Sequence, residues 1–439
     1  MSEAGTDMET DFDSLLKQAS RVSEQAEIIA AQGKSIEISA ESGAFSDVSE
    51  EEYSGFGIRV IRKGRVGFSF GSRIGERFGQ VLSRAVENAG IGGKLSGLPE
   101  KPGKYPKVSG LYDGNVALLS GKDLIERVRE IVGSAKRTGA KPTYSGAEAS
   151  SGEIVVANSN GVFARSKVSS VSGGCYANAE GSTGFEGKAS RKDNLDYPAF
   201  GRLSGERAVE GRHQRKFGTG KNVRIILHPY AVEGLLGGAL LPSIDGENVF
   251  RGNSSLDAGK IGNEIFSENF SLEDNGLLPG ENGSAPFDSE GVPCRRTAVF
   301  ERGVLKNFLY NWETSRRAGT GSTGNGFRGF ASTPKIGTTN AVVLPGKARE
   351  KELAKDADLS VLWLSGTHTI NPFSGEFSVE AKNSFAMRRG ERAFPTKPGI
   401  ISGNIFQVLK TVRVARDGIE RAGGGFITPP VLIEGDFVS

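Results

Sequence analysis

The sequence predicts an α+β protein, in which an N-terminal α/β-type sandwich of helices and antiparallel hairpins precedes a β-rich C-terminal domain. Amphipathic helical segments concentrate in the first half, whereas the second half alternates short apolar strands with tight turns. Glycine supplies 62 of the 439 residues. Because glycine is costly inside helices and favoured in turns and bulges, this content indicates many strands and tight connections.

The chain opens with a predicted helix over residues 9–32. Its apolar residues recur at three- and four-residue steps, and Gly33 ends the pattern. Ile36 and Ile38 then alternate with polar neighbours, which predicts a short strand.

The rest of the first half combines hairpins with helices. Residues 56–70 predict a β-hairpin that turns at a Lys-Gly pair, and residues 154–163 predict another that turns at Asn-Gly. Between them, one-sided apolar patterns predict helices near 75–89 and 121–137.

Residues 181–221 are rich in glycine and charge and lack periodic apolar residues, so we predict a linker there. It separates an α+β region, 1–215, from a β-rich domain, 216–439. In the second domain the sequence predicts one helix near 230–236 and hairpins such as that of 297–309.

Composition and charge argue against several classes of partner and location. Formal net charge is +3, from 55 basic and 52 acidic residues, and the basic residues are scattered, so we expect no nucleic-acid partner. Cys175 and Cys294 lie far apart without metal-ligand spacing, which suits packing in a reducing compartment. The N-terminus carries no apolar leader and no stretch resembles a membrane span. We therefore expect a cytoplasmic protein with no membrane partner.

Histidine is scarce. Only His213, His228 and His368 occur, and histidine is the usual base and zinc ligand near neutral pH. No serine or cysteine lies in a recognisable nucleophile motif. Each histidine taken alone is better explained by packing or a surface position than by catalysis.

His228 lies where an apolar strand ends and the helical candidate begins. A helical zinc-protease motif needs two histidines one turn apart and a glutamate beside the first. Here Pro229 takes the glutamate place and Val232 the one-turn place, and neither can bind metal or move a proton. Glu233 lies about 140° round the helix from His228 by the 3.6-residue period. The motif is therefore degenerate, and we predict no catalytic residue and no metal site in this chain.

Four carboxylates offer an alternative metal site to the degenerate motif at His228. Asp288, Glu290, Asp245 and Glu247 could bind a metal through oxygen ligands. Equally, Asp288 and Glu290 could hold a turn or face water, which is the usual fate of carboxylates.

Several segments of the second half occur in a recognisable order: FDSEGVP at 287–293, ERGVLKNFLY at 301–310, STGNG at 322–326, SGEFS at 374–378, ISGN at 401–404 and TPPVL at 428–432. With the strand and helix around His228, they resemble the TldD/PmbA family, formerly labelled modulators of DNA gyrase, and within it the PmbA (TldE) branch. The N-terminal half resembles the family more loosely, and residues 100–215 add little.

The resemblance implies that two different chains take the catalytic and the non-catalytic roles. In the TldD branch a zinc peptidase motif, HExxxH, follows the same strand, and a cysteine near the C-terminus is the third ligand. Here only His228 matches, and residues 410–425 contain no cysteine. The resemblance thus implies a non-catalytic subunit, without a cofactor of its own, that helps a zinc-bearing TldD-like partner to bind and proteolyse unfolded peptides. Two alternatives stay open: an independent metal-dependent hydrolase with an unrecognised site, and a self-associating peptide-binding module such as a homodimer.

Overall fold

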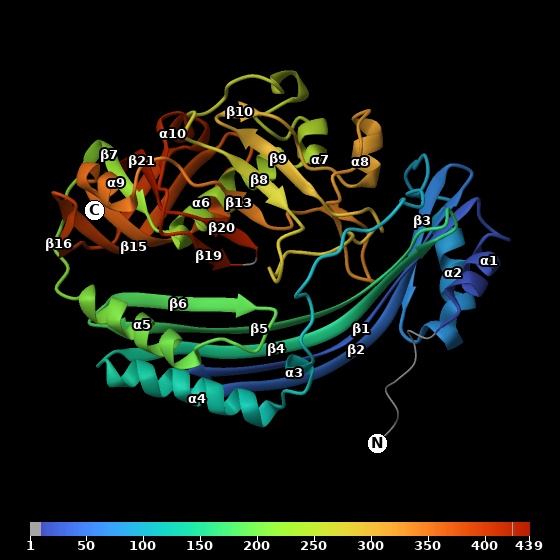
Figure 1. The fold of residues 1–439 in the computed structure, drawn as a ribbon, viewed down its shortest axis with the longest axis horizontal. Helices are drawn as coiled ribbons and strands as arrows, with labels where there is room; N and C mark the ends of the chain where they lie inside the picture. Colours follow the sequence, from blue (N-terminus) through green and yellow to red (C-terminus); the bar gives the residue numbers. More distant parts are fainter. Residues whose placement is uncertain (1–9, 424) are drawn as a thin grey trace.

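The structure is a computed structural model that describes residues 10–423 and 425–439. Its N-terminal part is built on a strongly curved antiparallel sheet with the strand order β3-β2-β1-β4-β5-β6 (Figure 1). The strands are β1 (Gln25–Glu41), β2 (Ala44–Arg62), β3 (Arg65–Gly71), β4 (Lys141–Asn158), β5 (Phe163–Ala179) and β6 (Ser182–Ser190). β6 forms the edge nearest the C-terminal domain, and β2 lies toward the far edge.

Helices cover one face of this sheet. They are α1 (Phe12–Ala19), α2 (Ile74–Asn88), the short α3 (Gly114–Ala117), α4 (Gly121–Arg137) and α5 (Tyr197–Glu210). Ile28 packs with α1 and α2, while Ile36 and Ile38 pack with α4 and α5. Because alternate residues of a strand share a face, these even-numbered residues place all four longer helices on the same side. The opposite face is therefore left for the C-terminal domain.

The C-terminal part contains two larger sheets. One is mixed, with the order β14-β7-β21-β17-β15-β16 and β18 beside β21, and the other has the order β10-β9-β8-β13-β20-β19. Their strands are β7 (Gly220–Leu227), β8 (Leu272–Asn275), β9 (Arg296–Glu301), β10 (Val304–Leu305), β13 (Ala341–Val343), β14 (Leu359–Ser365), β15 (Glu376–Arg388), β16 (Glu391–Pro395), β17 (Gly399–Asn404), β18 (Arg413–Val414), β19 (Glu420–Gly423), β20 (Phe426–Thr428) and β21 (Val431–Val438). A two-stranded sheet pairs β11 (Gly326–Phe327) with β12 (Lys335–Ile336).

A single apolar core holds these sheets together. Ile225 of β7, Phe300 of β9 and Phe437 of β21 belong to one buried cluster. The helices of this part are α6 (Pro229–Ala239), α7 (Gly246–Phe250), α8 (Trp312–Arg317), α9 (Glu350–Asp356) and α10 (Ile405–Thr411), of which α6 and α10 contribute buried residues to this core. The predicted α+β class and the β-rich C-terminal region are confirmed, as are the helices near 75–89, 121–137 and 230–236 and the hairpin of 56–70.

The predicted helix over 9–32 is wrong in its second half. α1 ends at Ala19, and β1 begins at Gln25. Residues 26–30 are buried without alternation, because this central strand packs against helices on one face and the C-terminal domain on the other. A strand that is buried on both faces has continuous apolar residues, which also fit a helical pattern.

The predicted linker over 181–221 is also wrong. It contains β6 and α5, and only residues 211–219 connect the last helix of the N-terminal part to β7. The glycines that suggested a loop serve close packing instead. A Cβ on Gly184 of β6 would lie 2.0 Å from the Ser204 carbonyl oxygen, and one on Gly201 of α5 would lie 1.9 Å from that of Ile131 in α4. Glycine therefore permits α5 to approach both β6 and α4.

Candidate functional site: the inter-domain cleft at His228

His228 connects β7 to α6 as the helix N-cap. Its Nδ1 accepts a hydrogen bond from the Tyr230 backbone N–H at 3.4 Å, and Pro229 occupies the first helical turn, where its missing N–H costs nothing. The local sequence therefore explains His228 as a capping residue.

The other imidazole nitrogen faces a carboxylate. His228 Nε2 lies 3.5 Å from Glu420 Oε1 at the start of β19. Because Nδ1 acts as an acceptor, Nε2 carries the proton and donates to Glu420. The hydrogen bond from His228 lowers the pKa of Glu420. Both ring nitrogens thus have a protein partner in this structure.

The remaining positions of the motif do not fit zinc. Val232 is only 1% exposed, in the apolar core. The spacing HExxxH places its second histidine five residues after the first, so the position to compare is Glu233 rather than Val232. Burial raises the pKa of the Glu233 carboxyl. Within residues 10–423 and 425–439, no three His, Cys, Asp or Glu side chains form a group that could hold a metal ion.

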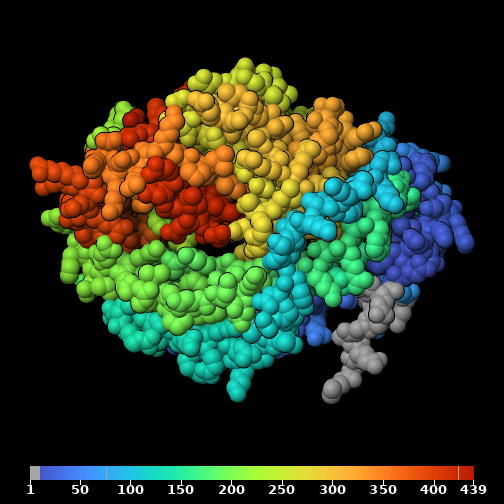
Figure 2. Space-filling view, in the orientation of Figure 1, coloured from blue at the N-terminus to red at the C-terminus, as the bar shows by residue number. Residues whose placement is uncertain are grey.

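Beside this motif lies a cleft of about 260 Å³ between the two halves of the chain. Residues 172–174 of β5 and 187–189 of β6 form one wall, and residues 421–423 and 425–427 of β19 and β20 form the other. Figure 2 shows the recess between these segments, above β6. β6 and β19 are each the outermost strand of their sheet. We refer to this hollow as the inter-domain cleft.

Side chains cover most of the outer edge of β6. Three alternate carbonyl oxygens accept hydrogen bonds from side chains. The side chain of Asn383 donates to the Thr183 carbonyl (3.3 Å), that of Arg207 to the Phe185 carbonyl (2.5 Å) and that of Tyr230 to the Gly187 carbonyl (3.2 Å). By the same alternation, Ala189 directs its backbone groups outward at the cleft. No group in the described part of the chain bonds to the outer backbone of Ala189.

Charge in the cleft is largely paired. Glu186 of β6 accepts from the Tyr230 hydroxyl at 2.8 Å and from Arg207 at 2.6 Å. Burial, and then the Glu186 charge, raise the pKa of Tyr230, so the phenol stays protonated and donates. At the cleft mouth Arg421 pairs with Glu281, with Nε–Oε distances of 2.9 Å.

An aromatic cluster closes one end of the cleft. The rings of Tyr176 and Phe185 stack at 4.6 Å, and Tyr230 meets Phe185 edge-on at 5.3 Å. Trp363 of β14 completes it at 6.0 Å from Tyr176. These contacts join β6 to α6 and to β14 beside the cleft, where Phe185 and Tyr230 belong to its lining.

The four carboxylates proposed as metal ligands serve structural roles. Asp245 caps α7 by accepting from the backbone of Glu247 and Asn248, and Glu247 pairs with Arg251 and Arg317. The structure does not gather them into a metal-holding group with Asp288 and Glu290.

Asp288 holds a turn, as one of the sequence alternatives predicted. It accepts from the backbone N–H groups of Glu290, Val292 and Gly326 at 2.8–3.0 Å. Burial and the neighbouring Glu290 raise its pKa, an effect that these three N–H groups oppose.

Glu290 belongs to a buried ion network between the domains. Arg59 of β2 lies 2.9 Å from Glu290 and 3.2 Å from Glu27 of β1, and Arg328 also pairs with Glu27. All four side chains are at least nine-tenths buried. The network fixes the C-terminal domain against the free face of the sheet. Sequence reasoning missed it, although a charged residue at a strand position flanked by apolar residues, as at Arg59, is a usable signal.

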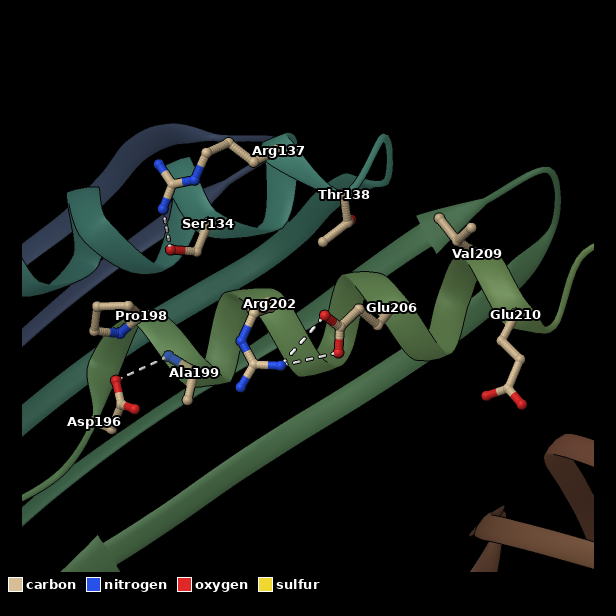
Figure 3. Close-up of a pocket in the computed structure, with 10 residues that line it drawn as sticks. All are labelled: Ser134, Arg137, Thr138, Asp196, Pro198, Ala199, Arg202, Glu206, Val209 and Glu210. Atoms are coloured by element: carbon tan, nitrogen blue, oxygen red, sulfur yellow. Dashed lines mark hydrogen bonds and ion pairs between the residues drawn. The ribbon is translucent and has the colours of Figure 1, made fainter.

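A larger hollow, of about 590 Å³, lies between α4 and α5 on the helical side (Figure 3). Several of its polar side chains bond to one another: Arg202 pairs with Glu206, and Arg137 donates to the Ser134 hydroxyl. Because few polar groups are left to converge on a ligand, size alone does not make it the candidate site.

The remaining predicted residues are peripheral. His213 is exposed and takes a left-handed backbone conformation, and His368 is exposed in a short 3₁₀ turn. Cys175 and Cys294 are both buried free thiols. Across the part of the chain that the structure describes, no helix has the length and apolar character that crossing a bilayer requires.

Comparison with known families defines the chain as metallopeptidase-related. Three family models match it: PmbA/TldA metallopeptidase domain 1 over residues 26–89, the central domain over 115–212 and the C-terminal domain over 219–438. The chain therefore belongs to the PmbA/TldD family of metallopeptidase-related proteins.

Whole-chain relatives agree with this assignment. An uncharacterised protein of Methanocaldococcus jannaschii is 28% identical over 98% of this chain and all of its own length. A metalloprotease of Methanothermobacter thermautotrophicus is 27% identical over 92% of this chain and 90% of its own length. The crystal structure of TldE from Thermococcus kodakarensis superposes with a TM-score of 0.88 at 25% identity, covering 98% of this chain and all of that one.

Proposed function

We propose that this chain is a non-catalytic, TldE-like subunit that pairs with a zinc-bearing TldD-like chain and helps it to bind and cleave unfolded peptides. The observation that carries the proposal is the set of contacts that His228 makes with its neighbours. One of its nitrogens caps α6 and the other faces Glu420, while Pro229 stands where a general base would be needed. These residues do not fit a catalytic zinc, which needs three protein ligands and an open position.

The inter-domain cleft supports the peptide-binding part of the proposal. It lies between two outermost strands, β6 and β19, and the outer backbone of Ala189 on β6 has no partner among the described residues. An extended peptide can add to a strand edge through main-chain hydrogen bonds that tolerate any side chain. Such binding favours unfolded chains, because most strands of a folded protein are already paired on both sides.

Replacing His228 by alanine tests the non-catalytic assignment. We expect peptidase activity of the mixture with a TldD-like chain to stay within about tenfold, a change of under about 1.4 kcal/mol in the barrier. Loss of the helix cap should lower stability by about 1 kcal/mol. His228→Asn, which keeps a capping acceptor, is the matched control. A loss of activity by three orders of magnitude in both variants, with the complex intact, would instead make His228 catalytic.

A further inference from the structure

The sheet of the N-terminal part has a long open edge. β2 begins at Ala44, but β3 pairs only with residues 56–62 of β2 and not with the earlier residues of that strand. Residues 44–53 therefore pair with β1 on one side only, and within the described chain no strand lies on the other side. Alternate residues of this stretch present unpaired backbone N–H and C=O groups outward.

This edge differs from the outer edge of β6. There, side chains cover the carbonyls of Thr183, Phe185 and Gly187: Asn383 and Tyr230 of the C-terminal domain and Arg207 of α5. Along residues 44–53, by contrast, Phe45, Val48 and Tyr53 are 46%, 59% and 45% exposed. Open backbone groups beside exposed apolar side chains are the features that another strand can pair with.

The open edge is strongly acidic. Residues 44–53 carry Asp47, Glu50, Glu51 and Glu52 and no lysine or arginine. Lys34 of β1 reaches only Glu50, at 2.6 Å. The adjoining sheet face is acidic as well, because Glu37 of β1 lies directly opposite Glu148 of β4.

The Glu37–Glu148 pair indicates that negative charge at this end of the sheet is not fully compensated. Like charges directly opposite one another on neighbouring strands destabilise a sheet. Burial, and then Glu37, raise the pKa of Glu148. A basic surface brought to this end of the sheet would relieve that repulsion.

A second copy of this chain does not suit the edge. Whatever the register, self-pairing would bring two copies of the run Asp47, Glu50, Glu51 and Glu52 together along one edge without a lysine or arginine between them. The occupant must instead supply lysine or arginine opposite the acidic run.

We propose that residues 44–53 of β2 are a docking edge for a basic β-strand of a different polypeptide, namely the catalytic chain of the proposed function. The inference rests on that proposed function and names the surface through which the pair forms. Main-chain hydrogen bonds along the edge set the register, and the acidic run selects a heterologous, basic strand over a second copy.

The test uses the full chain and, as probe, the purified chain with an intact HExxxH motif from the same genome. The variant Glu51→Lys with Glu52→Lys reverses the edge charge. The matched control, Glu268→Lys with Glu301→Lys, makes the same charge change at exposed positions of the C-terminal domain, where each glutamate has only exposed ion partners. Dissociation constants and hydrogen exchange of residues 44–53 are measured for each mixture.

We expect the edge variant to weaken the complex more than tenfold, the control to change it little, and outward amides of residues 44–53 to gain protection in the wild-type complex. A complex that forms without that protection and tolerates the edge variant would overturn the docking edge and leave the proposed function standing. A homodimer strengthened by the edge variant would also overturn it, in favour of a second copy. If no complex forms with any variant, the proposed function itself fails.

Discussion

A mixture of this chain with a TldD-like chain should cleave an unstructured peptide about a hundredfold faster than either chain alone, a difference of about 2.7 kcal/mol in the barrier. This chain supplies a cleft between two outermost strands, where the outer backbone of Ala189 is unbonded within the described residues, but no zinc ligand set around His228. The partner is expected to supply the metal. Neither chain alone would then both hold an extended peptide and activate water.

Two controls test whether the two chains share the catalytic work. Replacing the motif glutamate of the partner should abolish cleavage by the mixture, because the base is on that chain. A compact, stable folded domain should stay intact, since it offers no free strand to the cleft. If the partner alone matched the mixture, a subunit role for this chain in catalysis would be untenable.

Arg59→Met should destabilise the chain by about 3–5 kcal/mol, because it leaves the buried Glu290 carboxylate without its cation. Arg59 is 3% exposed and bonds both Glu27 and Glu290, which are fully buried. Glu27 keeps Arg328, but Glu290 would keep only the backbone N–H of Trp312, at 2.8 Å. Denaturant unfolding, followed by the fluorescence of the interface residue Trp312, measures the change.

A second substitution distinguishes charge from packing. Adding Glu290→Gln to Arg59→Met removes the unpaired charge, so part of the lost stability should return. Arg202→Ala, which breaks an exposed ion pair with Glu206, should change stability by less than about 1 kcal/mol. If the double variant were as unstable as the sum of its parts, the network would not act through the Arg59–Glu290 ion pair.

The fold could be predicted where local pattern and tertiary environment agree. The one-sided apolar patterns of α2 and α4 survive in the structure because each helix buries one face on the sheet. The start of β1 was misassigned because a strand that is buried on both faces loses its alternation. β6 and α5 were missed because their glycines exist to permit close contact, which no local pattern reveals.

The site could be predicted only in part, for a similar reason. His228 was found because it lies at a strand–helix junction that is visible in the sequence. Its partner Glu420 and the covering side chains Arg207 and Asn383 come from distant segments that only the fold brings together. The open edge of β2 is likewise a property of sheet order, since it exists because β3 is shorter than β2.

Zinc content of the purified complex tests the central claim most directly. Native mass spectrometry and elemental analysis of this chain, its partner and the pair would be compared after dialysis against a weak chelator. The account predicts one zinc per pair, retained by the partner alone and absent from this chain, because Pro229 offers neither a ligand nor a base and the described residues gather no three His, Cys, Asp or Glu side chains that could hold a metal ion. One tightly held zinc on this chain in isolation would contradict it.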